Sequence, residues 1–150
     1  MNTKEQQFSL LDMVGETHIF PNTQPSLICF IKEDCDTCNT AAPVLEALHK
    51  AYCGKVKVLL IAQSGEANAA YVDRHTLTMP TLDDRSCKTA FAWDIEVVPS
   101  VFWMDEDSTA VSRFEGFIRS DWEALNKDIS EHTALPKAQI DWNSLPAWRP

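Results

Sequence analysis

The sequence predicts an α/β fold in which a mixed central sheet is covered by helices on both faces. Two observations support this prediction. Segments with the composition of strands alternate with segments that have helical spacing of apolar residues, and a terminal hairpin is followed by a last helix. The chain has 150 residues, of which 45% are hydrophobic. This size suits one ordinary core and therefore a single main domain.

The first half of the chain contains two strong strands with a helix between them. Phe8 to Phe20 holds short apolar pieces around a glycine, which indicates a hairpin or an edge strand. The run Leu27–Ile31 reads as the central buried strand. A helix from about Cys35 to Tyr52 follows, and Lys55–Ala62 is a second strand whose continuous apolar run indicates burial on both faces. The expected core face of the helix consists of Leu45, Leu48 and Tyr52.

The second half continues the alternation and ends with antiparallel strands. We expect a helix from about Glu66 to His75, then a loop around Met79-Pro80, then a short helix over Asp84–Trp93. Ser100–Met104 and Ala110–Phe114 flank an acidic turn, which predicts a hairpin.

The C-terminal part holds a last helix and a segment of different composition. Ser120 and Glu123 have the spacing of a capping box, which predicts the start of a helix. Its expected core face is Trp122, Leu125 and Ile129. We therefore assign residues 1–132 to the domain and 133–150 to a tail that is rich in proline and tryptophan. The tail either folds against the domain or is a linker, and its two tryptophans favour the first interpretation.

The most informative motif is Cys35-Asp36-Thr37-Cys38, which lies between a predicted strand and a predicted helix. The first sulfur of such a pair can sit at the helix N-terminus, where unpaired N–H groups and the helix dipole favour a thiolate. The second lies one turn further and can close a disulfide with the first. The other cysteines show no framework spacing, so we interpret Cys29, Cys53 and Cys87 as structural. The motif predicts thiol–disulfide chemistry.

These residues resemble the thioredoxin fold. The order of elements, the junction of strand, CxxC and helix, and Pro43 five residues after Cys38 are similar to that family. Val98-Pro99 stands just before a strand, where the fold keeps its cis-proline. The lead-in Phe8–Gly15 and the added segment Leu82–Trp93 resemble the TlpA-like and peroxiredoxin-like branch. The resemblance covers roughly Phe8 to Ile129.

The chemistry and the resemblance together imply a site. Cys35, nearer the helix start, is expected to attack a disulfide, and Cys38 to resolve the mixed disulfide that results. Val98 and Pro99 are the expected substrate-binding residues, because a proline without an N–H leaves room for a substrate backbone. The resemblance further implies a cis bond before Pro99. Thioredoxins keep a buried acid six residues before the first cysteine, and this chain has Cys29 there.

Charges around the motif give an expectation for its redox potential. Glu33, Asp34 and Asp36 place negative charge beside the sulfurs, while Lys32 and the helix terminus act in the opposite direction. Each such charge is worth on the order of 1 kcal/mol or less in a solvated setting. We therefore expect a reductant with a midpoint near thioredoxin's value of about −270 mV.

Three alternatives remain open at this stage. Cys35 and Cys38 with His49 and Cys53 resemble zinc-ligand spacing, although a rigid helix would place His49 about 16 Å from Cys38. A peroxiredoxin-like peroxidase needs a threonine shortly before the reacting cysteine, where this chain has Lys32-Glu33-Asp34. The third is a binding or regulatory module without enzymatic activity.

The composition of the chain argues against some classes of binding partner. A formal net charge of −9 argues against non-specific binding to nucleic acid or to an anionic membrane. Met1–Gln7 lacks the features of a signal peptide, and no apolar stretch has the length of a membrane span. We therefore expect a cytoplasmic monomer that acts on a protein or small-molecule disulfide and takes electrons from a donor the sequence does not specify. With four glycines and no phosphate-binding loop, we expect no cofactor and no metal.

Overall fold

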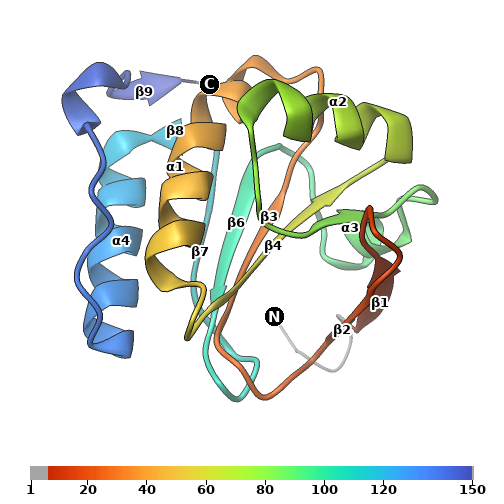
Figure 1. The fold of residues 1–150 in the computed structure, drawn as a ribbon, viewed down its shortest axis with the longest axis horizontal. Helices are drawn as coiled ribbons and strands as arrows, with labels where there is room; N and C mark the ends of the chain where they lie inside the picture. The colour runs from red at the N-terminus through yellow and green to blue at the C-terminus, as the bar shows by residue number, and fades with distance from the viewer. Residues whose placement is uncertain (1–6, 150) are drawn as a thin grey trace.

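The centre of the protein is a five-stranded mixed sheet. The structure is a computed structural model that describes residues 7–149 (Figure 1). The strand order is β5-β4-β3-β6-β7, and β3 pairs in parallel with β4 but antiparallel with β6. The mixed sheet is as predicted. The five strands are β3 (Ser26–Phe30), β4 (Lys57–Ala62), β5 (Thr81–Asp83), β6 (Ser100–Met104) and β7 (Ala110–Glu115).

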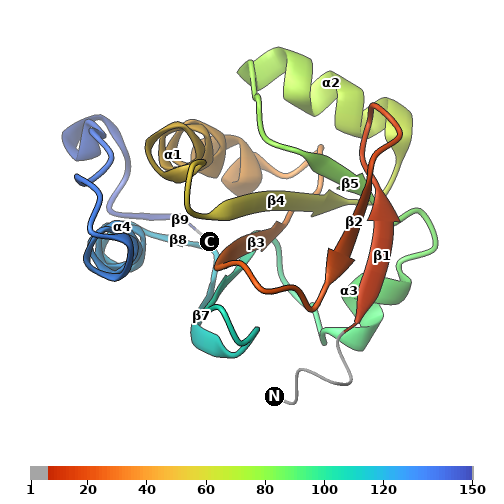
Figure 2. The same ribbon diagram turned by 60° about the horizontal axis from the view of Figure 1, so that its bottom comes forward.

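Helices and a hairpin cover the two faces of this sheet. On one face α1 (Asp36–Tyr52) lies beside α4 (Arg119–Thr133), and α2 (Gly65–His75) packs against α1 (Figures 1 and 2). The hairpin of β1 (Phe8–Leu11) and β2 (Thr17–Phe20) covers the other face together with the short helix α3 (Lys88–Ala92). The predicted helices on both faces are confirmed, and of the two alternatives for the N-terminal segment, a hairpin or an edge strand, the structure shows the hairpin. No helix in residues 7–149 is long and apolar enough to cross a membrane.

The central strand β3 is buried on both faces, and its alternation decides which side chains meet the helices. Successive side chains of a strand point to opposite faces. Leu27 and Cys29 belong to the core under α1 and α4, whereas Ile28 and Phe30 belong to the core under the hairpin. The side chain of Cys29 therefore lies on the same side of the sheet as α1.

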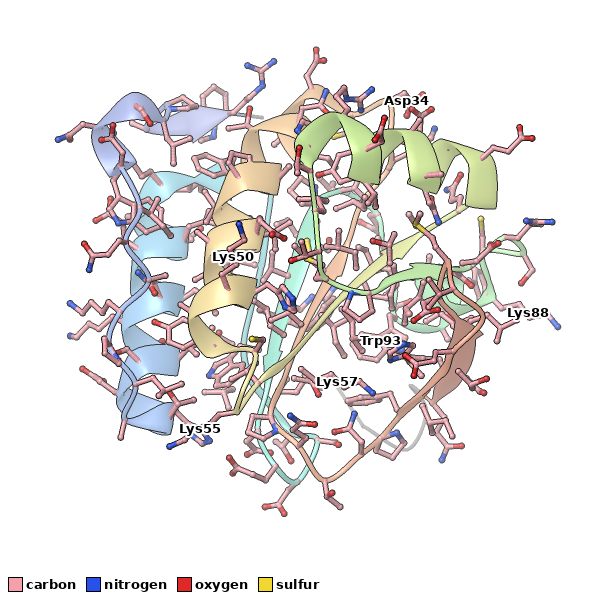
Figure 3. All side chains as sticks on the ribbon, viewed as in Figure 1. Asp34, Lys50, Lys55, Lys57, Lys88 and Trp93 are labelled. Carbon is pink, nitrogen blue, oxygen red and sulfur yellow. The ribbon has the colours of Figure 1, made fainter. Side chains whose placement is uncertain are left out.

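The core under the hairpin is built around one indole ring. Trp93 is fully buried between the sheet and the hairpin (Figure 3). Its ring centroid lies 4.9 to 6.0 Å from those of four phenylalanines. These partners come from β1, β2, β3 and β6: Phe8, Phe20, Phe30 and Phe102.

The predicted capping box at Ser120 is wrong. Helix α4 begins at Arg119, its N-cap is Ile118, and no side chain caps it. Ser120 is therefore already inside the first turn. The reason is a two-stranded sheet in which β8 (Phe117–Ile118) pairs with β9 (Trp148–Arg149). Strand β8 is followed at once by the first residue of α4. The N–H of Arg119 donates to the carbonyl of Ala147, so the tail supplies a partner that a capping side chain would otherwise provide.

The predicted helix over Asp84–Trp93 is also shorter than expected. Residues 81–83 form β5, which pairs in parallel with β4, and α3 covers only Lys88–Ala92. The buried carboxylate of Asp84 accepts hydrogen bonds from the N–H groups of Thr89 and Ala90, at 3.1 and 2.9 Å. Asp84 thus occupies a turn that fixes the start of α3 and is not part of the helix.

The tail packs against α1 and α4 (Figure 1). Ala138 is buried, and its N–H donates to the Tyr52 hydroxyl and to Asn126 Oδ1, at 3.2 and 3.1 Å. Asn126 Nδ2 donates in return to the carbonyl of Ala138 at 3.0 Å. These bonds hold the tail on the domain, while the position of the domain boundary at residue 132 stays a prediction.

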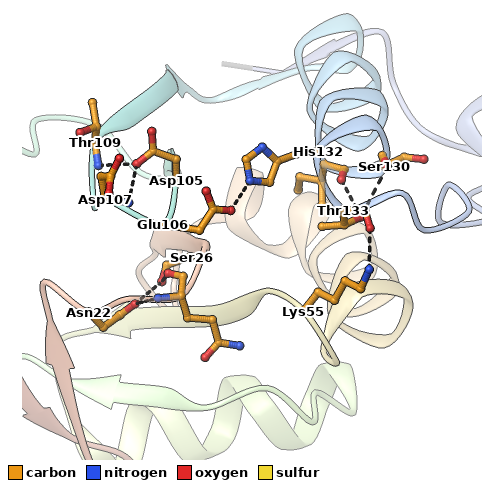
Figure 4. A network of polar contacts seen from close by, with 12 residues as sticks. Asn22, Ser26, Lys55, Asp105, Glu106, Asp107, Thr109, Ser130, His132 and Thr133 are labelled. Atoms are coloured by element: carbon orange, nitrogen blue, oxygen red, sulfur yellow. Dashed lines mark hydrogen bonds and ion pairs between the residues drawn. The ribbon is translucent and has the colours of Figure 1, made fainter.

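At the end of the molecule where α4 ends, polar contacts connect this helix to Lys55 and to the β6–β7 turn (Figure 4). Lys55 Nζ donates to the carbonyl of Thr133 at 2.8 Å, and His132 is bonded to Glu106 in the β6–β7 turn. The hydrogen bond from His132 lowers the pKa of Glu106. The N-terminus of α1 lies at the opposite end of the molecule (Figure 1).

Candidate functional site

Cys35 stands at the N-cap of α1. Its backbone is extended, its carbonyl accepts the N–H of Asn39 at 3.0 Å, and the N–H of Cys38 donates to its sulfur at 3.2 Å. The side chain is half-buried. An N-cap side chain that receives a helix N–H bond is stabilised as an anion, both by that bond and by the helix dipole. The sulfur therefore lies at the start of the helix, with a backbone N–H directed at it, where a partner can reach it.

Cys38 lies one turn further and is fully buried. Burial raises the pKa of its thiol, and the contact with Cys35 acts in the same direction. The Tyr71 hydroxyl of α2 donates to the backbone carbonyl of Cys38 at 2.7 Å and so fixes this turn of α1. Sequence reasoning did not identify Tyr71, because its position is that of an ordinary core residue. The two sulfurs therefore differ, since one is accessible and the other is buried and protonated.

The loop before β6 completes the arrangement. The peptide bond between Val98 and Pro99 is cis. The Cys35 thiol donates to the carbonyl of Val98 at 3.6 Å, and the carbonyl of Pro99 accepts the N–H of Gly116 at 2.8 Å. The structure thus brings together the four residues that the sequence singled out, although Cys35 and Val98 are 63 positions apart.

Cys29 of β3 lies in the core beneath α1 and contributes to the raised pKa of Cys38. It is fully buried, and burial raises the pKa of its thiol. The groups that act on the pKa of Cys38 are Cys35, Cys29 and the backbone of Lys32, none of which is a carboxylate. Among the acids that surround the motif, Asp34 and Asp36 are exposed and Glu33 is half-buried at the surface.

Three cations lie near the acids that surround the motif. Lys32 Nζ is 3.8 Å from Asp34 Oδ1, at the end of the molecule where α1 begins (Figure 3). Arg149 Nη2 of β9 is 3.6 Å from Asp36 Oδ2. Arg74 Nη2 of α2 donates to the carbonyl of Glu33 at 2.9 Å. Sequence spacing could not identify either arginine, because each lies far from the motif along the chain.

A cavity of about 210 Å³ adjoins the Val98 side of the site. Its wall is mostly apolar, and Lys32 and Glu96 are among its polar residues. The apolar part of the wall comes from β3 and the residue after it, β4, α3 and the loop before β6: Phe30, Ile31, Ile61, Ala62, Ala90, Ile95 and Val98.

The structure does not assemble the zinc site that the cysteine spacing allowed. Within residues 7–149, the one group of three or more potential metal ligands is Asp12, Glu16 and His18 on the N-terminal hairpin. Cys35 and Cys38 therefore do not form a ligand set with His49 and Cys53.

Comparisons with known proteins agree with this geometry. A secreted disulfide oxidoreductase from Mycobacterium tuberculosis, homologous to E. coli DsbE, superposes with a TM-score of 0.74 at 17% identity, over 87% of this chain and 99% of that one. A thiol-disulfide oxidoreductase from Bacteroides fragilis gives a TM-score of 0.71 at 23% identity, over 84% and 96%. StoA from Bacillus subtilis gives 0.69 at 16%, over 81% and 99%. No curated relative matches the sequence.

The solved neighbours share the thioredoxin-like fold with this chain, as the sequence predicted. The family model matches residues 2–112, which is most of the chain and includes Cys35, Cys38, Val98 and Pro99. The protein therefore belongs to the AhpC/TSA family.

Proposed function

We propose that the protein is a thiol–disulfide oxidoreductase that reduces protein disulfides with Cys35 and Cys38. The observation that best supports this is the asymmetry of the two sulfurs. Cys35 is accessible, receives a helix N–H bond and faces the Val98 carbonyl, whereas Cys38 is buried one turn behind it. A nucleophile needs access and a stabilised anion, and a resolving group needs only to reach the first sulfur.

The reaction follows from these positions. The Cys35 thiolate attacks one sulfur of the substrate disulfide, that S–S bond breaks, and the released substrate thiolate takes a proton. The product is a mixed disulfide on Cys35. Cys38 then loses its proton and attacks the Cys35 sulfur, which releases the second substrate thiol and leaves a disulfide between Cys35 and Cys38. Pro99 has no N–H to satisfy, so a substrate backbone can lie beside it and use the polar groups of Val98.

The proposed reaction is tested in a single-turnover experiment in which the free thiols of the protein and of insulin are counted. Reduced protein mixed with excess insulin is expected to lose two thiols per chain while insulin gains two. A peroxidase would instead be oxidised much faster by hydrogen peroxide than by insulin, and a binding module would keep its thiols with both. The acids before Cys35 disfavour the peroxidase.

The midpoint potential gives the direction of electron flow. We expect about −270 mV, close to thioredoxin, because the acids at the turn counteract the helix terminus. Equilibration with dithiothreitol or glutathione buffers, followed by alkylation of free thiols, measures it. A midpoint near −120 mV would instead identify an oxidant and contradict the proposed direction.

Resolution of the mixed disulfide by Cys38 is expected to be slow at neutral pH, because the buried residue at position 29 is a cysteine and not an acid that could accept the proton of Cys38. Cys38 has a raised pKa, so it is protonated at neutral pH, and its thiolate fraction grows as the pH rises. The rate of resolution should therefore rise about tenfold per pH unit from about pH 6 to 8. In Cys29→Asp a carboxylate can accept this proton, so resolution at pH 7 should be faster by about tenfold or more.

Cys29→Asn is the matched control, because it has nearly the same shape as Asp but no basic oxygen pair. Both variants place a polar group in the core and should lower the free energy of unfolding. Stopped-flow measurement of mixed-disulfide decay separates the two effects. Equal acceleration in the Asn variant, or none in the Asp variant, would show that proton removal from Cys38 is not limiting.

A further inference from the structure

The turn of the N-terminal hairpin gathers three side chains of the types that bind metal ions. Asp12, Glu16 and His18 each offer one ligand atom, and these three atoms lie within 4.8 Å of one another. Asp12 follows β1, Glu16 precedes β2 and His18 is the second residue of β2. The sequence predicted no metal, because only the closing of the hairpin, which pairs His18 with Leu10, brings the three side chains together.

The carboxylate of Asp12 is already oriented as a ligand. Its Oδ1 accepts the N–H groups of Val14 and Glu16, each at 2.9 Å. Carboxylates that bind metals are usually held by such hydrogen bonds from the surrounding protein. Its Oδ2 lies 2.8 Å from His18 Nε2. Two atoms that bind one ion at about 2.1 Å each, at close to a right angle, are about 3 Å apart. The spacing of Oδ2 and Nε2 therefore suits two ligands of one ion.

The group combines buried and exposed ligands. The side chains of Asp12 and His18 are 6% and 8% exposed, so water competes little for their ligand atoms. Glu16 is exposed, so its longer side chain is free to close on an ion that the other two hold. Three protein ligands leave at least one position of the metal to water.

An adjoining cavity holds a buried hydroxyl group that such a water can satisfy. The cavity has a volume of about 320 Å³, and Asp12, Glu16 and Thr81 are part of its wall. Thr81 is 2% exposed, and its hydroxyl has no hydrogen-bond partner among residues 7–149. Buried polar atoms in native proteins are normally bonded to protein, ordered water or an ion. The cavity therefore offers room for metal-bound water and an oxygen that can accept its hydrogen bond.

We propose that Asp12, Glu16 and His18 bind one divalent transition metal ion at the turn of the hairpin. The donor set selects this class of ion, because imidazole suits Zn²⁺ and its first-row neighbours, whereas Ca²⁺ and Mg²⁺ take oxygen ligands. This site does not involve the CxxC motif and is independent of the proposed function.

The metal would fasten the hairpin to the sheet that it covers (Figure 2). Asp12 also forms a bridge with Leu82 of β5, so a metal there ties the end of β1 both to β2 and to the sheet edge. Phe8 and Phe20 of the same hairpin pack on Trp93. An ion that binds only the folded hairpin therefore stabilises the whole domain.

The test uses Zn²⁺ and full-length protein whose accessible thiols have been alkylated with iodoacetamide, because free thiolates also bind zinc. Isothermal titration calorimetry should give one ion per chain. Glu16→Gln, at an exposed position that the fold tolerates, should weaken binding about tenfold or more, and His18→Gln should do the same. Zn²⁺ should raise the thermal midpoint of the wild-type protein but not that of Glu16→Gln.

His132→Gln is the matched control. His132 is also bonded to a carboxylate, that of Glu106, but within the described residues no third ligand joins this pair. Its replacement should leave zinc binding unchanged. The site is overturned if the alkylated wild-type protein binds no zinc, or if Glu16→Gln binds it as tightly as the wild type. An equal loss in His132→Gln, or tighter binding of Ca²⁺ than of Zn²⁺, also contradicts the proposal. If circular dichroism shows that His18→Gln is unfolded, Glu16→Gln decides.

Discussion

Cys35→Ser is expected to abolish the reduction of insulin, whereas Cys38→Ser should stop the reaction one step later. The serine hydroxyl is not ionised at neutral pH and cannot form a disulfide, so the first variant has no nucleophile. The second keeps the accessible thiol of Cys35 at the N-cap and can still attack, but it has no second sulfur that could displace the substrate from Cys35. Insulin should therefore accumulate on Cys38→Ser as a mixed disulfide. Non-reducing electrophoresis and mass spectrometry of the adduct measure this difference.

Cys53→Ser is the matched control for both variants. Cys53 is exposed at the far end of α1, so its thiol is accessible to reagents, but no second cysteine lies one turn away along the chain. Its replacement should leave insulin reduction unchanged and produce no adduct. Full activity in Cys35→Ser would show that another cysteine is the nucleophile, and the roles proposed for this motif would then be wrong.

Trp93→Ala is expected to cause the largest loss of stability among single core substitutions on the hairpin side of the sheet. The indole is fully buried and contacts rings from four strands, so its removal leaves a cavity that four separate elements line. Such large-to-small replacements cost about 3–5 kcal/mol in the free energy of unfolding. Urea unfolding followed by circular dichroism measures the loss.

Phe91→Ala provides the comparison for this prediction. Phe91 lies two residues before Trp93 and is also aromatic, but it is 86% exposed. Its replacement should change the free energy of unfolding by no more than about 0.5 kcal/mol. If both variants lost the same stability, the cost would come from disturbing α3 rather than from the aromatic cluster.

Much of the fold could be predicted from the sequence, because the central elements have strong local patterns. β3 and β4 are continuous apolar runs, and α1 has Leu45, Leu48 and Tyr52 on one face, all fully buried in the structure. The position of Cys35 at a helix N-terminus followed from the order of strand, motif and helix. The approach of Val98 could not be derived from spacing and depended on the resemblance to a known fold.

The elements that sequence reasoning missed depend on contacts between distant segments. β5 has three residues, too few for a strand pattern, and forms because Thr81 and Leu82 lie next to β4. β9 has two residues and pairs with a strand about 30 positions earlier. The false capping box at Ser120 has the same origin, since the tail provides a backbone partner for Arg119 that no local rule anticipates.

The ion pair between Arg149 and Asp36 has a practical consequence for anyone who handles this protein. Arg149 contacts the residue that follows the reactive cysteine, so bulk attached close to Arg149 would lie near the CxxC motif. An affinity tag or fluorescent label fused there would crowd the substrate's approach, and a polyhistidine sequence would add groups that titrate near neutral pH. Rates and potentials are therefore best measured on protein carrying its tag at the other terminus, or with the tag cleaved off.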